Sequence, residues 1–144
     1  FTLIELLVVM AIIGILVALV AGVSRYVMID SAKKETIAIQ SIVSQAIKTY
    51  RDSEGELPDV DASDDCGALM GRLSAVSASN RKLRNLPEDA WTSGSAPLMD
   101  GFDRPMKYDK DGGIGGTFVL ISAGADGKFN GDPEKAEDNI RSDR

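Results

Sequence analysis

The sequence predicts an α+β fold, in which one long N-terminal α-helix packs on a small antiparallel β-sheet. Three observations lead to this prediction: an unbroken apolar stretch over residues 3–23, a helical pattern without Pro or Gly over residues 25–54, and a β-branched, aromatic-containing segment at residues 117–122. We therefore divide the chain into an apolar helix segment at residues 1–24, an amphipathic continuation of the same helix at residues 25–54, and a small globular α+β domain at residues 55–144.

The apolar stretch is long enough to cross a membrane. From Leu3 to Val23 it contains 21 residues, about 31 Å as an α-helix at about 1.5 Å per residue, against a bilayer core of about 30 Å. It lacks the basic opening and the small-residue cleavage site of a secretory signal peptide. Because the chain begins at Phe1 and not at Met, we expect that a leader has been removed and that the apolar segment is retained as a membrane anchor.

Glu5 is the one charged residue in this stretch. The 14 Leu, Ile and Val residues of the stretch favour membrane insertion by about 4–8 kcal/mol, against a cost of about 3 kcal/mol for one acidic residue at mid-membrane. Insertion is therefore favoured, and two interpretations of Glu5 stay open. Either its side chain lies at the membrane interface, or it pairs with a cation, for which the α-amino group of Phe1 is the nearest candidate.

Composition argues against several classes of function. The net charge is −6 and the basic residues do not form a run, which argues against a nucleic-acid partner. The chain has no His, so it lacks Ser-His-Asp triads, Cys-His pairs and HExxH zinc sites. Its single cysteine, Cys66, cannot form an internal disulfide. We predict that the protein is not an enzyme, because only a carboxylate pair is left and no such pair lies in an evident cleft-forming motif.

The helix is predicted to continue beyond the apolar stretch with one apolar face. Five apolar residues recur at spacings of three and four between residues 39 and 50, with polar residues between them: Ile39, Val43, Ala46, Ile47 and Tyr50. Gly55 is a typical helix stop, and Pro58 prevents the helix from resuming. We expect this face to hold the globular domain, and to contact neighbouring chains only secondarily.

The segments after this helix carry weaker signals. A short helix is predicted over residues 65–76, with Ser63 or Asp64 as its N-cap. Residues 77–99 are rich in Ser, Asn, Gly and Pro and predict a loop. Trp91 is expected to pack beneath that loop, since most tryptophans are largely buried.

The C-terminal part predicts a hairpin. Residues 117–122 are β-branched and aromatic and follow a pair of glycines, which is typical of a β-strand. The glycine-rich residues 109–116 before the strand predict a turn. Their Asp-x-Asp-Gly sequence has the start of a calcium loop but lacks its distal Glu, so we interpret the segment as a turn.

The opening sequence Phe-Thr-Leu-Ile-Glu-Leu-Leu-Val-Val resembles that of the type IV pilin superfamily, which includes the pseudopilins of type II secretion. The resemblance implies that a prepilin peptidase cuts before Phe1 and that the new amino group is methylated. It also implies that Glu5 neutralises the amino terminus of an adjacent subunit while the helices pack into a filament core. The superfamily usually has proline where this chain has Gly22, and its helix often loosens between that proline and a glycine matching Gly14.

Three further segments resemble the major pseudopilin of type II secretion: residues 53–58, residues 100–108, and the sequence Ser-Ala-Gly-Ala-Asp-Gly at residues 122–127. The last resemblance implies a loop that ends at Ile140 and binds one calcium ion. The implied ligand region comprises the carbonyl of Ala123 and the residues Asp126, Asp132, Asp138 and Asn139. Residue chemistry agrees that the loop is rich in oxygen ligands, and an acidic surface turn without a ligand stays open as the alternative.

The resemblance implies a structural subunit that polymerises into a helical filament, the pseudopilus that drives protein export by a type II secretion system. Two alternatives are a type IV pilus subunit for adhesion or motility and, more distantly, a membrane-tethered enzyme. The implied partners are identical subunits, minor pseudopilins, the inner-membrane assembly platform, the prepilin peptidase and the membrane. The implied location is the inner membrane, crossed once, with the globular domain in the periplasm and the filament in the periplasm or at the cell surface.

Overall fold

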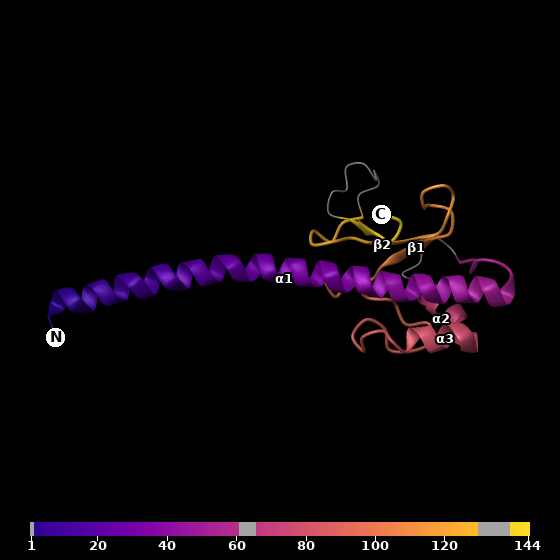
Figure 1. Ribbon diagram of the computed structural model, residues 1–144, viewed down its shortest axis with the longest axis horizontal. Helices are drawn as coiled ribbons and strands as arrows, with labels where there is room; N and C mark the ends of the chain where they lie inside the picture. Colours follow the sequence, from indigo (N-terminus) through magenta and orange to yellow (C-terminus); the bar gives the residue numbers. More distant parts are fainter. Residues whose placement is uncertain (1, 61–65, 130–138) are drawn as a thin grey trace. The chain divides into compact units, whose positions relative to one another are not determined.

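The computed structural model describes residues 2–60, 66–129 and 139–144. The chain divides into two compact units, residues 1–31 and residues 32–144, which we describe separately. The elements in chain order (Figure 1) are α1 (Leu3–Glu54), α2 (Gly67–Ala75), α3 (Ser77–Leu83), β1 (Lys107–Asp109), β2 (Val119–Ser122) and β3 (Ile140–Arg141). The predicted α+β class, a long N-terminal helix with a small antiparallel sheet, is confirmed.

Helix α1 is continuous through both Gly14 and Gly22. Each glycine costs about 1 kcal/mol relative to Ala in a helix interior, and the surrounding run of Leu, Ile and Val residues supplies no other breaker. The helix ends where the sequence predicts, because Gly55 has a positive φ of 85° and its N–H donates to the carbonyl of Arg51 at 2.8 Å. This left-handed conformation is favourable mainly for glycine.

The core of the second unit forms on the predicted apolar face of α1. Ile39, Val43, Ala46 and Ile47 are all 0–1% exposed, which confirms that face. Within this unit α2 and α3 lie on one side of α1 and the strands on the other (Figure 1). The core residues contributed by these flanking segments are Cys66, Leu69, Met70, Leu73, Leu83, Ala90, Leu98, Met106, Tyr108 and Leu120. The second half of α1 is therefore the central layer of a small three-layer unit.

The sheet has three antiparallel strands in the order β1-β2-β3. Tyr108 of β1 pairs with Leu120 of β2, and Ser122 of β2 pairs with Ile140 of β3. The predicted hairpin is confirmed, and the turn between its strands covers residues 110–118, where the sequence predicted residues 109–116. The strand is shorter than predicted, because β2 begins at Val119 and not at residue 117.

Two local predictions need correction. Residues 77–99 are not entirely loop, because α3 occupies Ser77–Leu83. A helix this short has no readable period, and its position is set by burial of Ser79 and Leu83, four residues apart on one face. The N-cap of α2 is Cys66, with a φ of 62° and no side-chain cap bond; Ser63 and Asp64 lie outside the described residues.

Trp91 packs against the core and is half-buried, whereas the sequence predicted a largely buried ring beneath the loop. Its indole Nε1 has no hydrogen-bond partner among the described residues. The Trp91 ring therefore contributes apolar contacts, and its indole N–H forms no hydrogen bond with the described residues.

Two polar side chains of α1 form hydrogen bonds with other segments of the second unit. Buried Gln40 donates from Nε2 to the carbonyls of Leu120 (3.3 Å) and Ile140 (2.9 Å), so that one amide joins two strands to α1. Thr36 Oγ1 donates to the carbonyl of Ala32 at 2.8 Å and accepts from the N–H of Gly101 at 3.0 Å. A Cβ on Gly101 would collide with the Ala32 carbonyl oxygen, so only glycine permits this close approach.

Replacing Gly101 by Ala should destabilise the second unit. The added methyl meets a backbone carbonyl inside a helix, which cannot rotate away, and overpacking of this kind costs about 1–3 kcal/mol. The measurement is chemical denaturation of the full-length protein in detergent, followed by the fluorescence of Trp91.

Gly71→Ala is the matched control. Its added methyl meets only the rotatable hydroxyl of Ser95, and it lies in the interior of α2, where Ala is favoured over Gly by about 1 kcal/mol. This variant should be as stable as the wild type or more so. Equal stability of Gly101→Ala and the wild type would contradict the packing described here.

Candidate functional site

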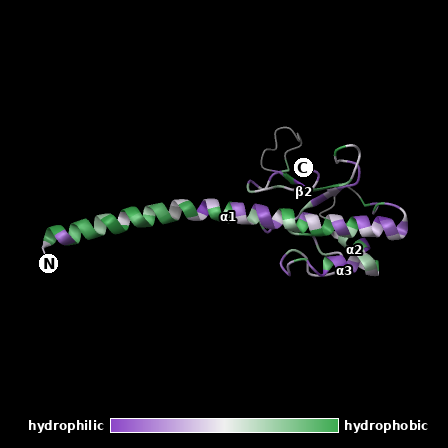
Figure 2. Cartoon of the chain, in the orientation of Figure 1, coloured by the Kyte–Doolittle hydropathy of each residue, from purple (hydrophilic) through white to green (hydrophobic). Residues whose placement is uncertain are grey.

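The first half of α1 carries an apolar surface that the other described residues leave uncovered. Every Leu, Ile, Val and Met between Leu3 and Val23 is at least 49% exposed, and in Figure 2 this part of the helix is coloured almost entirely as hydrophobic. By length and composition α1 is able to cross a membrane, and no part of its most apolar 18-residue window is buried among the described residues. A contiguous apolar surface that stays exposed along a whole helical stretch is typical of a membrane or protein interface.

Glu5 lies in a capping box at the start of α1. Its Oε2 accepts hydrogen bonds from the N–H of Thr2 at 2.9 Å and from Thr2 Oγ1 at 3.1 Å, while the N–H of Glu5 donates to Thr2 Oγ1 at 3.4 Å. The sequence signal for this arrangement is a Thr three residues before a Glu at the head of an apolar run, and our sequence reasoning missed Thr2. Phe1 lies outside the described residues, so pairing of Glu5 with its amino group stays a prediction.

The described part of the predicted calcium loop contains three of its predicted oxygen ligands. Ala123 is buried at the end of β2, Asp126 is exposed in the turn that follows, and Asn139 directly precedes β3. Asp126 Oδ1 accepts from the N–H of Lys128 at 2.8 Å. Asp132 and Asp138 lie outside the described residues.

Asn139 provides a test of whether this region fits a cation. Its Oδ1 is buried and has no hydrogen-bond partner in the described part of the chain, and an unpartnered buried acceptor is costly. An amide oxygen, a carboxylate and a backbone carbonyl are all hard oxygen ligands of the kind that calcium binds. Among residues 2–60, 66–129 and 139–144, no three His, Cys, Asp or Glu side chains form a metal-ligating group. These three oxygen ligands are therefore of the type that calcium binds, and they are fewer than the six to eight that a calcium ion takes.

A buried carboxylate holds the start of this loop. Asp100 Oδ2 accepts from Ser122 Oγ at 2.6 Å, and its Oδ1 accepts from the N–H groups of Phe102 (2.9 Å) and Arg104 (3.0 Å). Arg104 Nη1 then donates to the carbonyl of Gly124 at 2.7 Å. The turn that contains Asp100 thus fixes the backbone immediately before Asp126, a role that sequence reasoning did not identify.

A second polar cluster joins the C-terminal strand to the hairpin turn. Arg141 forms a two-pronged contact with Asp143, Nε to Oδ1 at 2.9 Å and Nη2 to Oδ2 at 2.8 Å, and both side chains are largely buried. Arg141 Nη2 also donates to the carbonyl of Gly112 at 2.8 Å, and Asp143 Oδ2 accepts from the N–H of Ile114 at 2.9 Å. The hydrogen bonds from Arg141, opposed by burial, lower the pKa of Asp143 to about 2.

Comparison with known families decides the identity. A family model described as the prokaryotic N-terminal methylation motif matches residues 1–21. A second, described as type II secretion system (T2SS), protein G, matches residues 26–141, most of the chain. This chain belongs to the type II secretion system protein G family. It is thus a type IV pilin-like protein and a pseudopilin, as the sequence resemblance implied. No curated protein and no solved structure matches it significantly.

Membership of this family indicates the general role of the chain. A pseudopilin is a structural subunit, processed by a prepilin peptidase and assembled with other components of the secretion system. The apolar helix and the methylation motif fit a protein anchored in the inner membrane with a periplasmic domain.

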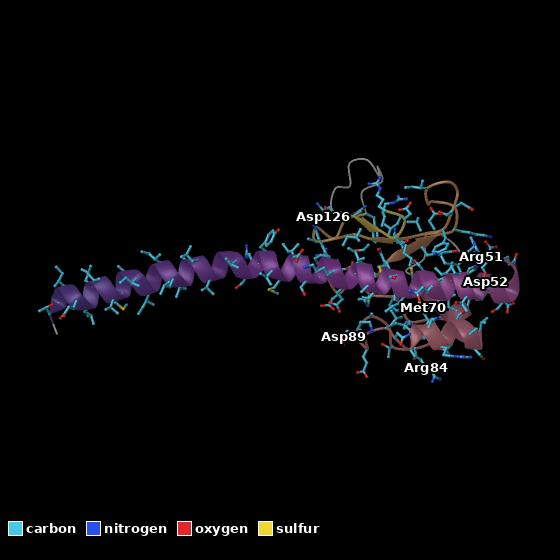
Figure 3. All side chains as sticks on the ribbon, in the orientation of Figure 1. Arg51, Asp52, Met70, Arg84, Asp89 and Asp126 are labelled. Carbon is cyan, nitrogen blue, oxygen red and sulfur yellow. The ribbon has the colours of Figure 1, made fainter. Side chains whose placement is uncertain are left out.

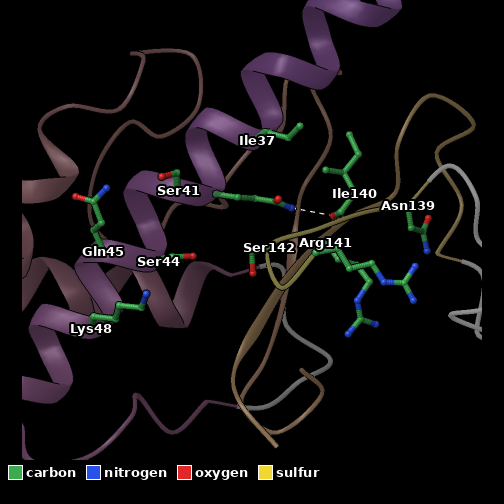
Figure 4. A pocket seen from close by; sticks show the side chains of 11 residues that line it. Ile37, Ser41, Ser44, Gln45, Lys48, Asn139, Ile140, Arg141 and Ser142 are labelled. Carbon is green, nitrogen blue, oxygen red and sulfur yellow. Dashed lines mark hydrogen bonds between the residues drawn. The ribbon is translucent and has the colours of Figure 1, made fainter. Parts of the chain in front are cut away.

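A groove lies on the described surface of the second unit, between α1 and β3 (Figure 4). It has a volume of about 560 Å³, and both apolar residues, such as Ile37 and Ile140, and polar residues, such as Gln40 and Lys48, line it. None of the described residues that line it is acidic or His.

Replacing Asp143 by Asn should destabilise the second unit in a pH-dependent way. Because the pKa of Asp143 is lowered when folded, the pair stabilises the fold above about pH 4, and this contribution disappears as the pH falls toward 2. The variant should lose about 2 kcal/mol of unfolding free energy at pH 7. At pH 2 it should differ little from the wild type. Denaturation curves at several pH values measure this.

Asp59→Asn is the control, because Asp59 forms an exposed ion pair with Lys110 at 3.2 Å, and such pairs contribute about 0–1 kcal/mol. A loss at Asp143 that stays constant from pH 7 to pH 2 would contradict the electrostatic explanation.

Proposed function

We propose that this pseudopilin polymerises into a helical pseudopilus that drives protein export by the type II secretion system. The observation that supports this is the uncovered apolar surface of α1 over residues 3–23. In the membrane, lipid covers these side chains. In the filament, the same side chains are covered by the α1 helices of neighbouring subunits. Removing apolar surface from water stabilises by about 25 cal/mol per Å², so both environments are far better than exposure.

The geometry of such a contact suits an open polymer. A helix packed against copies of itself that are displaced along one axis forms heterologous contacts, which do not close into a ring and therefore generate a fibre. Before assembly the subunit would cross the inner membrane once, with its globular unit in the periplasm. Phe1 would become the methylated N-terminus, and minor pseudopilins and the inner-membrane assembly platform would be its partners.

In this proposal Glu5 pairs with the amino terminus of Phe1 on an adjacent subunit. Oε2 is engaged by Thr2 in the capping box, but a carboxylate has about four lone-pair sites, so it retains capacity to accept a bond from a neighbouring ammonium group. An acidic side chain left unpaired in an apolar core is costly. The requirement to pair Glu5 would therefore fix the axial step between neighbouring helices.

Variants of Glu5 test this pairing. Glu5→Gln keeps a side chain that can complete the capping box and removes its charge, while Glu5→Ala removes both. We expect both variants to insert normally into the membrane, and filament yield to fall at least about tenfold, since an uncompensated ammonium group would remain in the filament core. The measurement is electron microscopy and sedimentation of filaments sheared from cells that carry the secretion genes.

Thr2→Ala is the matched control, because it removes the capping partner and leaves the charge of Glu5. It should assemble filaments like the wild type. A wild-type filament yield from Glu5→Gln would contradict the proposed charge pair. Long surface fibres in place of short periplasmic ones would instead indicate a type IV pilus subunit.

We also propose that calcium closes the loop between β2 and β3. The carbonyl of Ala123 and the side chains of Asp126 and Asn139 would hold it, together with Asp132 and Asp138. The buried Oδ1 of Asn139, which has no partner among the described residues, supports this, because a cation would satisfy it. When bound, the ion would offset repulsion among the acids of the loop and cross-link segments that no disulfide joins.

Thermal unfolding tests the calcium proposal. At a calcium concentration of about 100 times its Kd, the folded state gains about 2.7 kcal/mol, which raises Tm by about 10 °C for a unit of this size. Excess chelator should remove the gain. In Asp126→Ala the gain should be absent, while Asp111→Ala, in the hairpin turn, should keep it. The same rise in Tm for Asp126→Ala and wild type would defeat the proposal.

A further inference from the structure

Helices α2 and α3 carry a concentration of positive charge. Residues 66–87 contain four basic residues and no acidic residue, in a chain whose net charge is −6. Both helices bury their apolar side chains in the core, among them Leu73 and Leu83. Their basic side chains are all exposed. We define the basic patch as these four residues: Arg72, Arg81, Lys82 and Arg84.

The basic patch has no counter-charge within the described part of its own molecule. None of its four residues forms an ion pair with another described residue. Acidic residues return only at Glu88 and Asp89, which are also exposed. An uncompensated patch of one sign attracts a partner of opposite charge and orients it.

Exposed acidic residues gather at the end of α1. We define the acidic turn as Asp52, Glu54 and Glu56, which are all exposed. Asp52 makes one loose contact with Arg51 at 3.9 Å, and such exposed pairs are weak. Glu54 and Glu56 form no ion pair with any described residue.

The basic patch and the acidic turn are not paired within one subunit. Asp52 lies at the C-terminal end of α1, whereas Arg84 lies on the flank of the unit beyond α3 (Figure 3). Among the described residues, no ion pair joins the two surfaces. A contact between the end of one subunit and the flank of another is heterologous, the kind of contact that generates an open polymer.

We propose that the basic patch of one subunit binds the acidic turn of a second copy of this chain. The inference rests on the proposed polymerisation, which brings copies together at high local concentration. The sheet side of the unit is a poorer match, because acidic residues there have lysines next to them in the sequence, as in Asp109-Lys110-Asp111 and Asp126-Gly127-Lys128. Each exposed ion pair is weak and salt-sensitive, so the contact would set the orientation and register of the globular units while the apolar helices hold the polymer together.

Disulfide cross-linking tests the contact directly. A full-length variant with Glu56→Cys and Arg84→Cys should form a ladder of covalent multimers on mild oxidation of assembled filaments. The native Cys66 is buried, with 1% exposure, and it is present in every variant. Glu56→Cys alone and Arg84→Cys alone are the matched controls, and neither should give products larger than a dimer.

Exchange of charges between the basic patch and the acidic turn tests whether the proposed contact is electrostatic. The double variant Arg81→Glu and Arg84→Glu should reduce filament yield at least about tenfold, because like charges then face each other across the contact. Adding Glu54→Lys and Glu56→Lys to it should restore the yield to within about twofold. Adding Asp103→Lys and Asp111→Lys restores the same net charge at a different place and should not restore the yield.

The outcomes separate this inference from the proposed function. If wild-type filaments form but the two-cysteine variant gives no ladder, the contact is refuted and polymerisation stands. Equal recovery with the lysines at positions 103 and 111 would likewise refute it, since net charge alone would then explain the effect. A defect that neither exchange repairs would assign the patch to another anionic partner and overturn the proposal. If the wild type forms no filaments, the proposed function fails, and this inference with it.

Discussion

The apolar side chains of α1 between Leu3 and Val23 must be kept from water, and none of the other described residues covers them. A soluble domain would fold other elements over such a helix. Here the covering has to come from outside the described chain, first from lipid and then, in the proposed filament, from copies of the same helix. Membership of the protein G family gives this requirement its biological setting, because pseudopilins are structural subunits of a secretion system.

The same helix has a second role in its C-terminal half, where it is the central layer of the globular unit. The apolar face from Ile39 to Ile47 is fully buried, and the polar residues Thr36 and Gln40 tie the sheet and the Gly101 turn to the helix. Helix α1 therefore contains both the uncovered apolar stretch and, in its second half, the central layer of the globular unit. In the proposed filament, the opposite charges of α2–α3 and of the end of α1 would orient the subunits.

The globular unit is small and has no disulfide to hold its C-terminal segments. Polar contacts take that role in the described residues. Asp100 and Ser122 fix the entry to the β2–β3 connection, and the Arg141–Asp143 pair fixes the hairpin turn to the last strand. The proposed calcium ion would add a third tie in the same part of the molecule, where the Asn139 amide oxygen has no partner among the described residues. Stability here depends on a few directional contacts as well as on the core.

Local sequence rules were sufficient to predict the long helix, its apolar and amphipathic halves, its end at Gly55, and the C-terminal hairpin. Hydrophobic period, helix breakers and β-branched runs act over a few neighbouring residues, so each of these features can be recognised in a short segment. The opening motif from Phe1 to Val9 was specific enough to indicate the family by itself.

Other features became evident only in the folded chain. They include the helical conformation of Ser77–Leu83, the start of α2 after Cys66, and the contacts through which Asp100 and Arg141 organise distant backbone. The capping box of Thr2 and Glu5 lies between the two cases, because its spacing is local but its hydrogen bonds depend on the side-chain conformations. The rest arise from contacts between residues far apart in the sequence, and such contacts leave no pattern within a single segment.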